Sequence, residues 1–130
     1  MLFKKLKEIE EQYEMGEAPD PDELSGEYYV TAPCFPWFSL EPLKHRKDVG
    51  LEGEGENVMA GGMRFGNFQL VKEDDSLLID YDLDENAAHM RRVVDRIRRT
   101  PDGRLIGKLH YRLFGEEVFL LYFEMVPKED

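Results

Sequence analysis

The sequence predicts a mostly β protein, an antiparallel β-barrel of about eight strands with an N-terminal α-helix. Short runs rich in aromatic and β-branched residues recur at roughly 8–12-residue spacing, and turn signals separate them. A clear amphipathic pattern stands at the start of the chain. The 130 residues, 42% of them hydrophobic, suffice for one core. We therefore expect a helix over 1–16, an acidic linker over 17–23 and one barrel domain over 24–130.

The predicted helix has its apolar residues Leu2, Phe3, Leu6, Ile9 and Tyr13 at three- and four-residue spacing, with charged residues between them. We expect this apolar face to pack against the barrel. A helix that docks on a partner or a membrane surface is the alternative, although its glutamates would be repelled by anionic lipid. The linker that follows, EAPDPDE, contains two prolines and several acids and is expected to be extended.

In the first half of the barrel, prolines and glycines obscure the strand pattern. The run 28–31 is aromatic and β-branched and predicts a strand. Prolines interrupt the apolar stretch 34–43, which predicts an irregular or edge segment. The basic run 44–47 is expected to be a loop. Weak strands are expected near 50–53 and 56–60, where glycines indicate turns, bulges or close backbone approach.

The second half of the chain gives clearer signals for hairpins. Strands are predicted over 65–72 and 77–82, joined by the turn EDDS. A second pair is predicted over 104–114 and 118–126, and a Gly-Glu turn lies between them. The last of these strands, VFLLYFEMV, is strongly apolar.

The segment before the second hairpin has two interpretations. Met90, Val93 and Ile97 have helical spacing, but the TPDG that follows is a hairpin turn and requires a strand before it. We therefore predict a helical or irregular start near 87–91 and a strand from 92 to 99. Along that strand two faces alternate, one made of Val93, Asp95 and Ile97 and the other of Val94, Arg96 and Arg98.

Several of these pieces resemble a known group of barrels. The segment LSGEYY (24–29) resembles the Gly-X-Trp opening of lipocalin-like proteins, with Tyr28 in the place of Trp. The resemblance covers about 24–126 and is to small uncharacterised prokaryotic proteins of lipocalin-like type. It implies a lipocalin-like fold and a ligand cavity, and it implies no known activity. The matching residues further along are Asn57, LIDY (78–81), Asn86, VDRIR (94–98), GK (107–108) and FLLYF (119–123), with Ala87 where a proline usually follows the asparagine.

The negative charge of the chain argues against nucleic acid as a binding partner. Against 28 Asp and Glu residues there are 17 Lys and Arg residues, which gives a formal net charge of -11. A general nucleic-acid binder needs a net positive face, so we exclude that class. The N-terminus has no apolar stretch typical of a secretory signal, and no window approaches the length of a membrane span. We expect a soluble, cytoplasmic protein.

The sequence offers no motif for a metal, a cofactor or an activated nucleophile. The single cysteine, Cys34, excludes an internal disulfide and a multi-cysteine metal site, and it has no cationic neighbour in sequence to activate its thiol. His45, His89 and His110 lack metal-ligand spacing. The run DYDLDE (80–85) begins like a calcium-binding loop but has Glu where that loop requires Gly. The glycine-rich runs lack phosphate-binding spacing. We expect no metal and no cofactor.

An excess of positive charge in the second half points to a ligand site. Between 84 and 112, 8 Lys and Arg residues stand against 4 acids. These arginines either pair with acids outside the barrel, or Arg96 or Arg98 points inward and holds a carboxylate or phosphate through its planar guanidinium. An inward arginine needs a partner when no ligand is bound, and Asp80, Tyr81 or Asn57 can supply one.

The leading functional hypothesis is non-catalytic binding of a small apolar ligand with an anionic or polar head inside the barrel. The predicted ligand-binding residues are Tyr28, Trp37, Asn57, Tyr81, Arg96, Arg98 and Tyr111.

Two other classes of function stay open at this point. One is a protein-interaction module, a homodimer included, that has a filled barrel and uses the N-terminal helix and the apolar segment PCFPWF (33–38). The other is an isomerase or hydrolase at the barrel mouth, with Asp80 or Asp95 acting together with a tyrosine. No pair of groups at catalytic spacing is visible, so an enzyme is the less favoured class and no catalytic residue is predicted.

Overall fold

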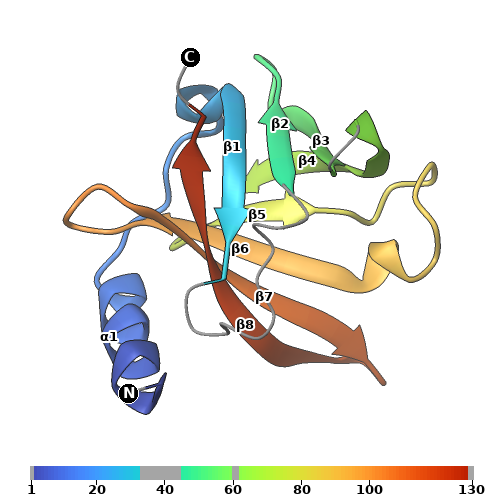
Figure 1. Cartoon of the computed structure of the whole chain (residues 1–130). Helices are drawn as coiled ribbons and strands as arrows, with labels where there is room; N and C mark the ends of the chain where they lie inside the picture. Colours follow the sequence, from blue (N-terminus) through green and yellow to red (C-terminus); the bar gives the residue numbers. More distant parts are fainter. Residues whose placement is uncertain (1, 33–44, 60–61, 129–130) are drawn as a thin grey trace.

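The computed structural model describes residues 2–32, 45–59 and 62–128 and shows a closed β-barrel with an N-terminal helix (Figure 1). The strands follow one another round the barrel in chain order, each antiparallel to the next, and β1 pairs with the residues 124–127 of β8 to close the sheet. The predicted fold class is confirmed. The strands are β1 (Gly26–Thr31), β2 (Arg46–Val49), β3 (Glu54–Val58), β4 (Arg64–Lys72), β5 (Leu77–Asp80), β6 (Val93–Arg99), β7 (Leu105–Leu113) and β8 (Glu116–Pro127).

The helix α1 (Leu2–Glu14) lies beside the barrel and not inside it (Figure 1). Its residues Ile9 and Tyr13 are buried against Ile106 of β7 and Tyr122 of β8, which form a small apolar cluster on the outer face of the sheet. The Tyr13 and Tyr122 rings lie 5.7 Å apart. The apolar face of α1 therefore packs on the barrel, as the periodicity predicted. No helix in the described ranges is long and apolar enough to cross a membrane.

The inward side chains of the strands form the main core. In β6 the predicted alternation is observed: Asp95 and Ile97 are buried, while Arg96 between them is only half-buried. The strand begins after a short 3-10 turn (Met90–Arg92), which matches the expected helical start. The core cluster consists of Leu24, Tyr28, Val30, Val49, Phe68, Leu70, Leu77, Ile79, Tyr81, Ile97, Leu105, Phe123 and Met125.

Two glycines on inward positions make room for aromatic rings. A Cβ atom at Gly107 would overlap the ring of Phe123, its cross-strand neighbour on β8. A Cβ atom at Gly55 would overlap the ring of Phe68, its neighbour on β4. Both rings are fully buried because the opposite residue has no side chain. The glycines thus set how deeply these rings enter the barrel.

The predictions for the first half of the barrel were partly wrong. Residues 46 and 47, expected in a basic loop, begin β2, and the expected strand near 50–53 is a turn between β2 and β3. The error arose because a run of lysine and arginine residues, considered with its sequence neighbours alone, indicates a solvent-exposed loop. In the barrel, Arg46 faces out and pairs with Asp48, whereas Lys47 faces in.

The acidic linker is held more closely to the barrel than its composition predicted. Glu17 exchanges two backbone hydrogen bonds with Arg99 of β6, at 3.0 and 2.8 Å. Pro21 begins a 3-10 turn (Pro21–Leu24), and Leu24 is part of the core. The segment 33–38, with Trp37 and Cys34, lies outside the described residues.

The packing of Gly107 against Phe123 can be tested by a double-mutant cycle. Gly107→Ala should lower the free energy of unfolding by about 1–3 kcal/mol, because the added methyl group overpacks the ring. Phe123→Leu should also destabilise, but the double variant should lose less than the sum of the two. Urea unfolding of the four proteins measures the coupling. Strict additivity would show that the glycine is not needed for the ring.

Candidate functional site

Among the described residues, four buried polar side chains face the interior of the barrel beside its apolar core. They are Lys47 of β2, Asn57 of β3, Tyr81 just after β5 and Asp95 of β6, and each is at most 3% exposed. Lys47, Asn57 and Asp95 occupy inward positions of their strands and Tyr81 follows the end of β5, so closure of the sheet brings the four together. We call this group the interior polar cluster.

The contacts within the interior polar cluster centre on the Lys47 ammonium. Its Nζ lies 2.7 Å from Asn57 Oδ1, 2.5 Å from the Tyr81 hydroxyl and 3.8 Å from Asp95 Oδ2. Asn57 Nδ2 lies 3.1 Å from the same hydroxyl. The ammonium also lies 5.2 to 5.7 Å from the centres of three aromatic rings, whose faces attract a cation.

Chemistry fixes the direction of these hydrogen bonds. A lysine ammonium and an amide NH2 group can only donate. Lys47 therefore donates to the Asn57 carbonyl oxygen and to the Tyr81 hydroxyl oxygen, and the Asn57 amide donates to that same hydroxyl. His45 Nε2 lies 3.0 Å from the Asn57 oxygen, which can only accept, so His45 carries its hydrogen on Nε2.

Asp95 lies at the edge of this hydrogen-bonded group. Its Oδ2 is 3.8 Å from Lys47 Nζ, which is an ion pair beyond hydrogen-bond distance. Burial raises the pKa of its carboxyl, and the neighbouring Lys47 and Tyr81 lower it. The second carboxylate oxygen, Oδ1, is buried and has no hydrogen-bond partner in the described part of the chain. Buried polar atoms are normally paired, so this oxygen is an unsatisfied acceptor of the interior polar cluster.

Burial is the main cause of the pKa shifts in this region. It lowers the pKa of Lys47 to about 8, against the opposing effect of the Asp95 carboxylate. It raises the pKa of Asp95 to about 6, because desolvation outweighs the nearby Lys47 charge. The pKa of Tyr81 lies well above its usual value, through burial and then the Asp95 charge. Burial and the Lys47 charge lower the pKa of His45 to about 4. At neutral pH, Lys47 and Asp95 are thus an ion pair and His45 is neutral.

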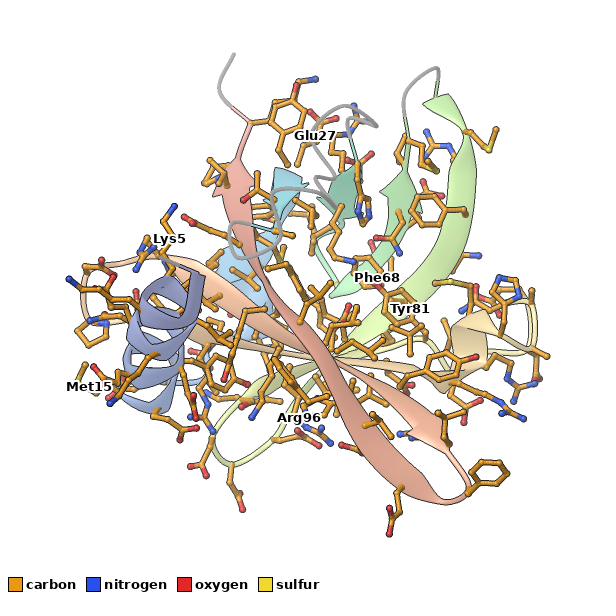
Figure 2. All side chains as sticks on the ribbon, turned by 60° about the horizontal axis from the view of Figure 1, so that its bottom comes forward. Lys5, Met15, Glu27, Phe68, Tyr81 and Arg96 are labelled. Carbon is orange, nitrogen blue, oxygen red and sulfur yellow. The ribbon has the colours of Figure 1, made fainter. Side chains whose placement is uncertain are left out.

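A cavity of about 350 Å³ opens onto this polar group. Lys47, Asp95 and His45 supply its polar lining, and β7 and β8 supply much of its apolar wall. Figure 2 shows Phe68 and Tyr81 next to each other in the barrel, with ring centres 5.7 Å apart. The other residues that line the cavity are Val30, Met59, Phe65, Leu109, Leu120, Leu121 and Phe123.

The structure brings together only two of the predicted site residues, Asn57 and Tyr81, within the interior polar cluster. Tyr28 is a core residue of β1, and Tyr111 is a half-buried residue of β7; neither lines the cavity. Trp37 lies outside the described residues.

The expectation that Arg96 or Arg98 points inward is not met. Both alternate with the inward Asp95 and Ile97 and therefore lie on the outer face. Arg96 pairs with Glu73 at 2.9 Å and with Glu117 at 2.6 Å, and Figure 2 shows it away from Phe68 and Tyr81.

Arg98 holds α1 against the barrel. Its guanidinium lies 4.4 Å from the centre of the Tyr13 ring and donates to the Tyr13 carbonyl oxygen at 3.1 Å and to Ser76 at 2.9 Å. Arg96 and Arg98 therefore both pair with residues outside the barrel, which is the first of the two interpretations given for these arginines.

Sequence reasoning missed Lys47 and His45, and it named Asp95 only for an enzyme. The sequence did contain one indication of this site: Asp95 shares a face of its strand with the apolar residues Val93 and Ile97, which favours an inward position. A carboxylate in that position needs a cation or donors inside the barrel. No group of three or more His, Cys, Asp or Glu side chains that could hold a metal occurs within the described residues.

The chain was compared with protein-family models, curated proteins and solved structures, and none of them matches. The lipocalin-like resemblance of 24–126 therefore stays a prediction drawn from short motifs. The fold class is shown by the structure, which is a closed antiparallel barrel with an N-terminal helix.

Proposed function

We propose that the barrel binds a small apolar molecule with one polar head and releases it unchanged. The observation that supports this most is the combination, in one cavity, of apolar walls and a buried polar end. Lys47 and Asp95 form the polar end. Small-molecule sites in proteins commonly have this composition, in which apolar side chains give affinity and a few polar groups fix orientation.

The cavity volume sets the size of the ligand. A volume of about 350 Å³ is at the lower end of the usual range for ligand pockets. At roughly 30 Å³ per non-hydrogen atom, the share of one water molecule, about a dozen such atoms fill it. A medium-chain aliphatic molecule or a single substituted ring has this size.

In this proposal the polar head lies beside Lys47 and Asp95 and not beside the arginines. Arg96 and Arg98 are engaged by Glu73, Glu117 and Tyr13 on the outer face. The dimer alternative is supported less, because Ile9 and Tyr13 of α1 are already buried against the barrel of the same chain.

We expect saturable one-to-one binding of decan-1-ol or decanoate by isothermal titration calorimetry. Leu109→Trp should weaken binding by about tenfold or more, because the larger side chain occupies the cavity. Val71→Trp is the matched control, since Val71 is exposed on β4 and does not line the cavity. If the folded wild-type chain binds neither compound, the proposed function is wrong.

A second candidate function is proton transfer of the isomerase type in the same cavity. Asp95 favours it, because a buried carboxylate whose pKa is raised to about 6 suits a general base near neutral pH. In this candidate, Tyr81 is the tyrosine that acts with Asp95, whose charge contributes to its raised pKa.

Nonan-2-one in deuterated water tests the proton-transfer candidate. If Asp95 removes and returns a proton next to the carbonyl group, NMR will show faster deuterium incorporation there with the wild-type chain than with Asp95→Asn. Circular dichroism checks that the variant is folded. Equal rates for the two proteins would exclude Asp95 as the base for this probe.

Both functions depend on an ionised Lys47–Asp95 pair, which makes stability depend on pH. Folding raises the pKa of Asp95 to about 6, so the folded state binds this proton more tightly than the unfolded state. The contribution of Asp95 to stability is therefore greatest below about pH 4 and is lost as the pH rises through about 6. Folding lowers the pKa of Lys47 to about 8, so stability recovers as the pH rises from about 8 to about 10.

The reference for this test is Lys47→Met/Asp95→Leu, because apolar replacement of a buried ion pair often preserves the fold. The difference in free energy of unfolding, wild type minus double variant, should fall by on the order of 1–3 kcal/mol between about pH 4 and 6 and rise above about pH 8. His45, whose pKa is lowered to about 4, is present in both proteins, so its effect largely cancels. A difference that does not vary with pH would show that folding shifts the pKa of neither Asp95 nor Lys47.

A further inference from the structure

We propose that the polar head of the ligand is an uncharged hydroxyl group that donates its hydrogen to Oδ1 of Asp95. This inference rests on the proposed function and names the class of ligand, an apolar alcohol or phenol. The observation that carries it is the buried Asp95 carboxylate, which lines the cavity and keeps one oxygen without a partner in the described ranges.

Most donors of the interior polar cluster already have partners. Two of the three Lys47 hydrogens go to Asn57 and Tyr81, and Asp95 Oδ2 lies 3.8 Å from the same nitrogen. The His45 hydrogen goes to Asn57. In the described ranges, the third Lys47 hydrogen and the Tyr81 hydroxyl hydrogen are the donors left, and a ligand carboxylate or phosphate that used them would stand against the Asp95 carboxylate. The acceptors left for a ligand are Asp95 Oδ1 and, in the tautomer fixed above, His45 Nδ1.

The charges in the cavity also favour a neutral head. Lys47 and Asp95 compensate each other inside the barrel. An anionic head would be placed against Asp95, and a cationic head would be placed close to Lys47. Either one would bring an additional, uncompensated charge into a buried site, which is unfavourable by several kcal/mol. A hydroxyl group adds no charge.

A hydroxyl group also removes the cost of the unpaired oxygen. A hydrogen bond to a charged acceptor is stronger than one between neutral groups. A hydrocarbon or an ether of the same size cannot donate, so it leaves Oδ1 unsatisfied. Among ligands whose tails are of equal size, we therefore expect those with a hydrogen-bond donor at the end of the tail to bind more tightly.

The test compares decan-1-ol with methyl nonyl ether by isothermal titration calorimetry, above the pKa of Asp95 at about 6. The two compounds are isomers and differ in having or lacking a donor. We expect the alcohol to bind about tenfold or more tightly than the ether. Decanoate and decylamine, with similar tails and charged heads, should bind more weakly than the alcohol.

The control variant is Lys47→Met/Asp95→Leu, which keeps the apolar walls and removes the acceptor. We expect it to bind alcohol and ether with affinities equal to within about threefold. The wild-type comparison decides the inference even if this variant does not fold. Equal binding of alcohol and ether by the wild-type chain, or tightest binding of decanoate, would overturn the inference and leave the proposed function in place. If the wild-type chain bound none of these compounds, both the inference and the proposed function would be wrong.

Discussion

A sheet that closes on itself turns its inward side chains away from bulk water, and this constraint governs both the packing and the chemistry of the chain. Pairing of β1 with β8 completes the closure. Apolar side chains on inward positions then fill a shared core. Polar ones must find partners inside, since an unpaired buried charge is strongly destabilising. In an open sheet with one wet face, Lys47 could extend into solvent; here it is surrounded by Asn57, Tyr81 and Asp95.

The parts of the fold that were predicted from the sequence are those whose signals are local. The hairpins of the second half follow from turn residues and from period-two alternation, both of which lie within a few residues of each other. The strand β6 was distinguished from a helix by the turn TPDG after it, and its alternation correctly placed Asp95 and Arg96 on opposite faces. The amphipathic pattern of α1 likewise predicted a packed helix.

The parts that were not predicted depend on contacts between distant residues. Lys47 lies in the run KHRK, whose local composition indicates a solvent-exposed loop. Its burial is stabilised by Asn57, Tyr81 and Asp95, which come from three other parts of the chain. Arg98 shows the converse: alternation gives two faces of a strand, but only the position of α1 shows that the arginine face is the outer one. A local pattern shows which residues of a strand share a face, but it does not show which of the two faces points into the barrel.

The short pairing between β1 and β8 has a consequence for how copies of the chain meet. In the described ranges, residues 116–123 of β8 have a strand on one side only, and Val118, Phe119 and Leu120 are exposed there. An apolar strand edge is a template to which another molecule can add a strand. Glu116 and Glu117 stand at one end of this free edge and Glu124 follows its other end, and charged side chains on an edge oppose the addition of a strand. The acids at the two ends of this stretch thus act against edge-to-edge association.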